Sequence, residues 1–238
     1  VLKQIDQSIR DREIQIYLRN EDLENKIIEL GMAGNVKKTD QDYLMIVNTN
    51  IGGGKTDEVI SQNVFLKSDV QSDNSIINTL KITRKHNGVE GDLFTGLKNK
   101  DYLRIYVPQG AVLIETSGFS EVDKAEFKKP VDFLKADEDL VKAEKNEYYA
   151  GDGTRIYEES GKTVFANWLD LDPGQTQTIT IKYKLPFDFN SNYNLYLQKQ
   201  SGSREFDFLT TLMFNGQKIE NLGKLNTDII WQPNSFLK

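Results

Sequence analysis

Residues Tyr43–Thr56 read YLMIVNTNIGGGKT, an apolar strand-like run followed by glycines and a Lys-Thr pair. Such a stretch opens either a phosphate-binding P-loop or a turn between two β-strands. A P-loop needs a glycine five residues before its Gly-Lys pair and an α-helix directly after it. Thr49 occupies that glycine position, and the following residues Asp57–Val70 are rich in β-branched and aromatic side chains. We therefore expect Ile51–Lys55 to form a hairpin or bulged turn that binds no nucleotide.

From residue 42 to residue 187 the sequence predicts almost only β-strands. Apolar and polar residues alternate over short segments, which are separated by turn sequences such as Asn87-Gly88. The expected strands are Tyr43–Thr49, Glu58–Val70, Ser75–Lys85, Tyr102–Pro108, Ala111–Gly118, Lys162–Leu171 and Gln175–Leu185. Seven short strands with this spacing predict a mainly β fold, an antiparallel β-sandwich of immunoglobulin-like type.

The segments that flank the predicted sandwich have different patterns. Residues 1–41 predict a helix–strand–helix unit that ends an upstream domain. Its elements are a helix over Val1–Ile9, a strand over Asp11–Leu18, and a second helix capped by Asn20 and ended by Gly31.

Strands resume in residues 188–238. They are expected at Asn192–Gln198, Glu205–Phe214 and Asp228–Gln232. These strands either extend the first sandwich or form a small second β unit packed on it, and we favour the second unit.

Two stretches interrupt the strand pattern. Gly88–Asp101 is punctuated by glycines, and its Leu93 and Phe94 are expected to tuck back onto the sandwich. Residues 121–152 are a charge-rich insertion of mixed sign, typical of a solvated surface. It contains a short predicted helix over Leu134–Lys145, with Leu134, Val141 and Leu140 facing inward. Such a long insertion is expected to lie across an edge of the sandwich. Its anchors would be Phe127 and Phe133, with Tyr148 and Tyr149 at its exit.

Composition excludes several classes of function. The net charge of −6 argues against nucleic acid as a partner, since phosphate binding needs a concentrated basic surface. The absence of cysteine excludes disulfides, thiolate zinc sites and cysteine nucleophiles. The single histidine, His86, precedes an Asn-Gly turn, so we interpret it as an exposed turn residue. No apolar run is long enough to cross a bilayer, and no signal peptide is evident. The sequence starts at Val1 and not at Met, so we expect an excised segment of a longer protein.

Acidic pairs offer no convincing site. Asp170 and Asp172 could hold calcium, but Asp before Pro-Gly is ordinary turn chemistry. Glu158 and Glu159 are neighbours on a predicted strand and so face opposite sides, which excludes a glycosidase pair. With no nucleophile–base motif in its expected context, we predict no catalytic residue, no metal and no cofactor.

Aromatic residues suggest sugar binding, because aromatic rings stack on the apolar faces of sugars. Tyr157 and Trp168 lie in strand-like runs and are interpreted as core residues. Candidate contacts for a partner or a glycan are Tyr148, Tyr149, Phe127 and Phe133.

The stretch DYLMIVNTNIGGGKTDEVISQNVFLKSDV, residues 42–70, resembles the downstream half of a bacterial family, domain of unknown function number four thousand and twelve. Other similar segments are REIQIYLRNEDLENKIIELGMAG, LKITRKHNG, GLKNKDYLRIYVPQGAVLIETSGFS, GKTVFANWLDLDPGQTQTITIKYKLPF and YNLYLQKQSGS. The family has no assigned reaction. The resemblance implies a bacterial envelope protein with an N-terminal membrane anchor, of which this chain is the C-terminal, outward-facing part.

Two functions follow. The first is a non-enzymatic, extracytoplasmic β-sandwich segment of an envelope-anchored protein, with a structural, adhesive or scaffolding role at the bacterial cell surface. The alternative is a glycan-binding or glycan-handling module associated with exopolysaccharide or cell wall. The expected partner is a cell-surface protein or glycan, with no nucleic acid, no nucleotide, and membrane contact only through an anchor outside this segment.

Overall fold

The strands and helices account for most of the chain in a computed structural model that describes residues 2–52, 54–121, 135 and 137–233. The helices are α1 (Leu2–Arg10), α2 (Glu21–Glu29), the three-residue 3₁₀ helix η1 (Asp57–Val59) and α3 (Glu138–Ala143). The strands are β1 (Asp42–Val47), β2 (Ile60–Val70), β3 (Ser75–His86), β4 (Asn99–Pro108), β5 (Val112–Ser117), β6 (Lys145–Tyr149), β7 (Arg155–Glu159), β8 (Lys162–Leu171), β9 (Thr176–Asp188), β10 (Leu195–Gln198), β11 (Phe206–Phe214), β12 (Gln217–Leu225) and β13 (Ile229–Trp231). No helix among these is long and apolar enough to span a bilayer.

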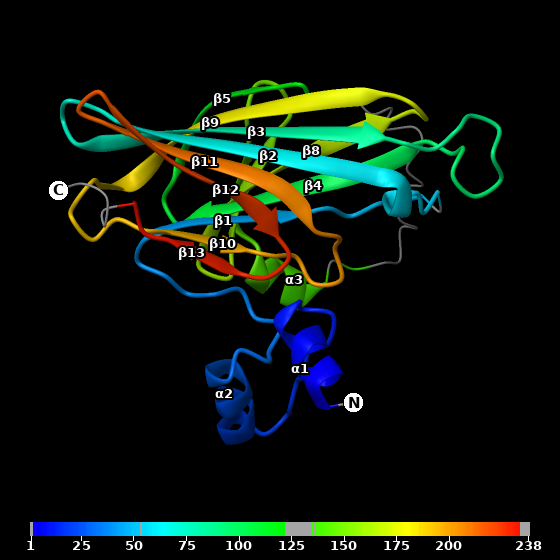
Figure 1. Cartoon of the computed structure of the whole chain (residues 1–238), viewed down its shortest axis with the longest axis horizontal. Helices are drawn as coiled ribbons and strands as arrows, with labels where there is room; N and C mark the ends of the chain where they lie inside the picture. Colours follow the sequence, from blue (N-terminus) through cyan, green and yellow to red (C-terminus); the bar gives the residue numbers. More distant parts are fainter. Residues whose placement is uncertain (1, 53, 122–134, 136, 234–238) are drawn as a thin grey trace.

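The strands form two mixed sheets. The seven-stranded sheet has the order β13-β10-β1-β4-β8-β7-β6, and the six-stranded sheet has the order β12-β11-β2-β3-β9-β5 (Figure 1). Two pairings, β1 with β10 and β2 with β11, are parallel, so the expectation of antiparallel sheets is wrong there. The reason is topological: the β1–β2 and β10–β11 connections both cross from the seven-stranded to the six-stranded sheet, side by side and in the same direction.

One apolar core fills the space between the two sheets. Leu44, Ile105 and Phe165 reach it from the seven-stranded sheet, and Leu66 and Ile179 reach it from the six-stranded sheet. The alternation predicted for the strand at 175–185 is confirmed, since its predicted inward side chains are buried. They are Ile179, Ile181, Tyr183 and Leu185. Burial of each large aliphatic side chain stabilises the fold by about 1.5–3 kcal/mol.

The glycine-rich turn is part of a crossover and not a hairpin. β1 and β2 belong to different sheets, so residues 48–59 carry the chain from one sheet to the other. The turn is closed by its own side chains: Asn50 Nδ2 donates to the Gly54 carbonyl and Lys55 Nζ donates to the Asn50 carbonyl, both at 2.7 Å. It leads into η1, which is too short to present the helix N-terminus of a P-loop.

The N-terminal unit contains its two helices, but the expected strand at 11–18 is absent from the described chain. Asn20 caps α2 as predicted, with Oδ1 accepting from Leu23 N at 3.0 Å. Within residues 11–18, Ile16 N donates to the Met32 carbonyl, but a single bond does not make the ladder that defines a strand. The unit is tied to the sheets by ion pairing of Arg12 with Asp228 and by Lys199, whose Nζ donates to the Asp11 carbonyl.

Residues 188–233 extend both sheets instead of forming a unit of their own. β10 and β13 lengthen the seven-stranded sheet, and β11 and β12 lengthen the six-stranded one. β12 was not expected from the sequence. Its hairpin with β11 turns at Asn215-Gly216, where both residues have positive φ, as a tight two-residue turn requires.

The loop between β3 and β4 differs from expectation in two ways. Leu93 and Phe94 do not tuck inward: they are 86% and 84% exposed. His86 is fully buried, because it continues the inward face of β3. Its Nε2 contacts the Leu97 carbonyl at 2.9 Å and its Nδ1 accepts from Gly88 N, so the ring fastens both ends of the loop. A side chain at Gly88 would collide with that ring and with the Thr95 carbonyl.

The charge-rich insertion is partly regular structure. Residues 145–149 form β6, an edge strand paired with β7, and α3 covers the middle of the predicted helix. Leu140 and Val141 are 60% and 64% exposed, so the helix does not bury them as expected. Phe127, Phe133 and Leu134 lie outside the described residues.

A buried carboxylate joins the two sheets inside the core. Asp42 on β1 accepts from Asn78 Nδ2 at 3.0 Å and from the Tyr193 hydroxyl at 2.8 Å, and Asn78 belongs to the opposite sheet. Burial raises the pKa of Asp42 from its ordinary 3.8 to about 6, although these donors and nearby Lys162 oppose the rise.

The buried Asp42 should make stability fall as pH rises. Between pH 4 and 6 the folded protein holds a proton on Asp42 that the unfolded chain has released, so the free energy of unfolding decreases through this window. At about 1.4 kcal/mol for each pH unit, the group contributes a loss of about 3 kcal/mol. Urea unfolding at pH 4, 5, 6 and 7 measures it, with Asp42→Asn as the matched variant. Equal pH slopes in the two proteins would contradict the assignment.

Candidate functional site

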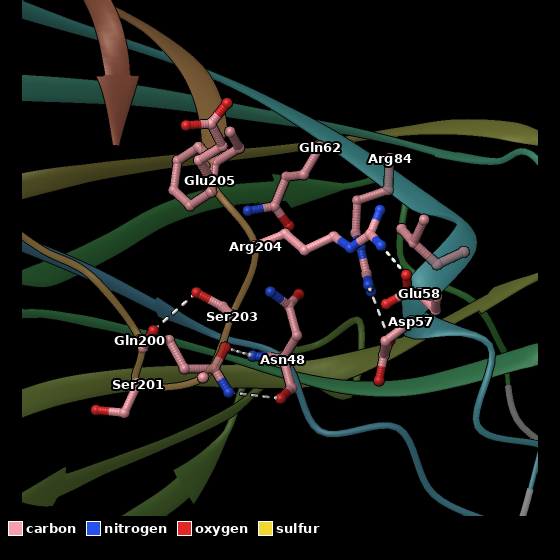
Figure 2. A pocket seen from close by; sticks show the side chains of 13 residues that line it. Asn48, Asp57, Glu58, Gln62, Arg84, Gln200, Ser201, Ser203, Arg204 and Glu205 are labelled. Atoms are coloured by element: carbon pink, nitrogen blue, oxygen red, sulfur yellow. Dashed lines mark hydrogen bonds and ion pairs between the residues drawn. The ribbon is translucent and has the colours of Figure 1, made fainter. Parts of the chain in front are cut away.

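The two crossovers enclose a polar pocket of about 220 Å³ at one end of the sheets (Figure 2). One wall comes from the β1–β2 crossover and the first residues of β2, and the other comes from the β10–β11 crossover. The end of β3 closes the back. Its lining residues are Asn48, Asp57, Glu58, Ile60, Gln62, Arg84, Gln200, Ser201, Gly202, Ser203, Arg204, Glu205 and Phe206.

Arg84 forms the back of the pocket and is held by two acids. Its side chain is 3% exposed and pairs with fully buried Asp101 on β4, and with Asp57 at 3.5 Å. Asp101 also accepts from Thr49 N at 2.6 Å, so the pair joins the crossover to both sheets. Burial raises the pKa of Asp101 to about 6, against the opposing effect of Arg84. Asn99 Nδ2 donates a hydrogen bond to the Asp57 carboxylate at 3.0 Å and so fixes the position of Asp57 beside Arg84.

The side of the pocket near β10 is built by Gln200. Its Oε1 accepts from Asn48 N and its Nε2 donates to the Asn48 carbonyl, both at 2.9 Å. The Gln200 side-chain amide thus satisfies both backbone groups of Asn48, the residue after β1, as a neighbouring strand would. The Ser203 hydroxyl donates to the Gln200 carbonyl at 2.7 Å and tightens the turn. At the rim, Arg204 pairs with Glu58 across the gap between the crossovers (Figure 2).

Three buried polar atoms in the pocket wall have no hydrogen-bond partner within the described part of the chain. They are Arg84 Nε, Gln62 Oε1 and Asn48 Oδ1. Such groups are costly to bury unsatisfied, about 1–3 kcal/mol each. Asn48, Gln62 and Arg84 come from three separate segments and line one hollow (Figure 2). The three atoms themselves are covered by protein, so a bound molecule would reach this one donor and two acceptors only after the side chains rotate.

The charges around the pocket nearly cancel. Arg84 and Arg204 stand against Asp57, Glu58 and Glu205. An anion such as phosphate would meet three carboxylates, and the described residues contain no group of three potential metal ligands. The arrangement suits a small uncharged molecule that both donates and accepts hydrogen bonds.

The predicted contact residue Tyr149 lies at a second, wider hollow on the outer side of the seven-stranded sheet. This groove of about 760 Å³ is also lined by Tyr102 and Trp168, whose ring centroids are 4.8 Å apart. The Tyr149 hydroxyl donates to Glu147 at 2.7 Å, and Arg155 holds Glu147 at 2.9 Å. Tyr148, next along β6, is 54% exposed and does not line the groove.

Of the other residues weighed from the sequence, Trp168 lines the same groove as Tyr149, and the rest reach neither hollow. Tyr157 is buried, as expected of a packing residue, while Trp168 is only partly buried. Glu158 accepts from Gln109 at 2.9 Å, and Glu159 accepts from the Tyr106 hydroxyl at 2.7 Å. Asp172 pairs with Lys98 at 3.5 Å.

The pocket residues Asn48, Gln62, Arg84 and Gln200 were not expected from the sequence. A signal for Arg84 exists: it follows Leu80 and Ile82 at the two-residue spacing of the buried face of β3. A charged residue at such a position must find a buried partner. Asn48 and Gln200 lie in connections, and no local pattern indicates that they meet.

Comparisons with known proteins identify no family. No family model matches the chain, and no curated protein matches it, so the resemblance described above stays a prediction. Among solved structures, a proposed nutrient binding protein from Legionella pneumophila is similar, with a TM-score of 0.34 and 8% identity. The match covers 73% of this chain and 56% of that one, so the chain spans little more than half its length.

Proposed function

We propose that the chain is a non-enzymatic, adhesive segment of an envelope-anchored bacterial protein, and that it binds an uncharged glycan unit in the crossover pocket. The observation that carries the proposal is the set of three unsatisfied buried atoms from three segments within the described chain. A sugar ring presents hydroxyls that both donate and accept, which matches one donor and two acceptors. The volume of about 220 Å³ lies below the roughly 300–1,000 Å³ of pockets for drug-sized ligands, and so suits a single ring.

The pocket also offers apolar surface for the faces of a sugar. Phe206 and Ile60 line it beside the polar groups, and aromatic and apolar surfaces pack against the C–H faces of sugars. The aromatic groove at Tyr149 gives a second observation in favour of a glycan. The chain's expected partners therefore remain a cell-surface glycan, or a protein that carries one.

We further propose an extracytoplasmic position at the bacterial surface and an immunoglobulin-like sandwich modified by the two parallel crossovers. The shared core between two facing sheets supports the sandwich. The lack of cysteine and the resemblance to an envelope family support the location. In this proposal the scaffold is structural and the pocket supplies specificity.

Glycan-array screening followed by titration calorimetry tests the proposed function. We expect binding of uncharged glycans, and about tenfold weaker binding for Gln62→Met, which removes one unsatisfied acceptor at similar side-chain size. Stability should not fall and should rise, because the change removes a buried acceptor, Gln62 Oε1, that has no partner within the described chain. The matched control is Gln71→Met in the exposed turn between β2 and β3. Failure to bind any uncharged glycan, or equal affinity in the two variants, would refute the pocket assignment.

A further inference from the structure

The loop between β3 and β4 carries an exposed apolar tip formed by Val89, Leu93 and Phe94. Leu93 and Phe94 are 86% and 84% exposed, and Val89 beside them is 70% exposed. Asp92 fixes the turn: its carboxylate accepts from Phe94 N at 2.9 Å and from Thr95 N at 2.7 Å. With the buried His86 ring holding the base of the loop, the two large side chains are presented on an ordered support that projects beyond the sheets (Figure 1).

A matching apolar row crosses the outer face of the six-stranded sheet. Leu222, Leu209 and Phe65 are direct neighbours on β12, β11 and β2, and their side chains alternate with core residues. Leu222 is 76% exposed. A hollow of about 320 Å³ lies along the row. The neighbouring rows are polar, namely Asn63, Asp207 and Lys224 on one side and Lys67, Thr211 and Glu220 on the other.

One charged residue on each surface is complementary to one on the other, although Asp207 also lines the hollow beside Lys81. Lys81 continues the apolar row on β3, and Glu90 stands beside the apolar tip. Neither side chain has an ion-pair partner in the described part of the molecule. Because the loop leaves the end of β3 and points away from the sheets, the tip does not reach the row of its own chain (Figure 1).

We propose that the apolar tip of one copy of this chain docks on the apolar row of a second copy. The two surfaces differ, so the contact is heterologous and leaves one free tip and one free row at its ends. Repeated contacts would produce open chains of molecules, as suits proteins arrayed on a surface. A contact made by a few side chains of one loop buries much less than the roughly 1,600 Å² of stable complexes, so we expect it to be transient in solution and to appear at high protein concentration.

Sedimentation velocity over a concentration series tests this proposal without any glycan. The wild-type chain is expected to show a rising average mass. The tip variant Leu93→Ser/Phe94→Ser and the row variant Leu222→Lys should each associate at least about tenfold more weakly, because a buried aromatic or aliphatic contact is lost. An equimolar mixture of the two variants keeps one intact tip and one intact row, so it should form two-chain species and nothing larger.

Charge exchange gives a second, independent readout. Glu90→Lys and Lys81→Glu should each weaken association, and the two changes combined in one chain should restore it. The control Ile230→Ser removes another exposed apolar side chain, on β13, which is 59% exposed, and should leave association unchanged. The proposal would be overturned by a wild-type chain that remains monomeric, by a mixture of variants that does not associate, or by an equal loss of association in the control. The exposed tip would then be a contact for another protein or a lipid surface. None of these outcomes bears on the glycan pocket.

Discussion

Replacement of Tyr183 by Asp is expected to unfold the protein or to remove about 5 kcal/mol of stability, a loss comparable to the whole stability of an ordinary domain. Tyr183 is completely buried, its ring lies 5.7 Å from that of Phe165 on the opposite sheet, and its hydroxyl accepts from Asn78 Nδ2 at 3.2 Å. The substitution removes this contact between the sheets. It also places a carboxylate beside buried Asp42, where neither charge is solvated.

Lys184→Asp is the matched control, because it introduces the same residue on the exposed side of the same strand. It should change the free energy of unfolding by no more than about 0.5 kcal/mol. If Tyr183→Asp does not fold, Tyr183→Phe gives a measurable value of about 1 kcal/mol, the cost of one hydrogen bond. Urea unfolding followed by circular dichroism measures all three. Similar losses for the two Asp variants would show that the strand does not face the core as described.

Strands with local alternation could be predicted from the sequence, whereas their partners could not. The strand predicted at Lys162–Leu171 coincides with β8, and the inward side of β9 was identified residue by residue. The parallel pairing of β1 with β10 joins segments about 150 residues apart. Alternation fixes which side of a strand is buried and carries no information on which distant strand lies beside it. For this reason the sequence predicts a separate C-terminal unit, whereas in the structure the C-terminal strands extend both sheets.

Polar residues at buried positions account for the errors near the site. The Asn-Gly pair after His86 predicts an exposed turn residue, yet His86 keeps the two-residue spacing of the buried Leu80 and Ile82. Asp101 likewise lies two residues before the buried Leu103, on the same face of β4. If the alternating pattern is followed through charged residues as well as apolar ones, it predicts that Arg84 and Asp101 are both buried. The pocket itself would still have been missed, because it depends on two crossovers meeting in space.

Removal of Arg84 is expected to cost about 3–5 kcal/mol, because it leaves the Asp101 carboxylate buried without its cationic partner. Arg84→Met keeps most of the side-chain volume, and urea unfolding measures the loss. Arg204→Met at the rim of the same pocket is the control. Its pair with Glu58 is solvent-exposed, so its loss should stay below about 1 kcal/mol.

The cost of Arg84→Met should grow with pH. Burial already holds the pKa of Asp101 at about 6 with Arg84 present, and removal of the guanidinium raises the pKa further. Below pH 5 the Asp101 carboxyl group is then neutral in the folded variant, so the loss of stability is small. By pH 8 the unfolded chain has released this proton, while the folded variant must either retain it or bury a charged carboxylate. In both cases the free energy of unfolding falls as pH rises. Asp101→Asn in the Arg84→Met background should recover most of the loss and remove its pH dependence. Additive losses in the double variant would instead mean that the two side chains act separately, and that the pocket wall is not held by this ion pair.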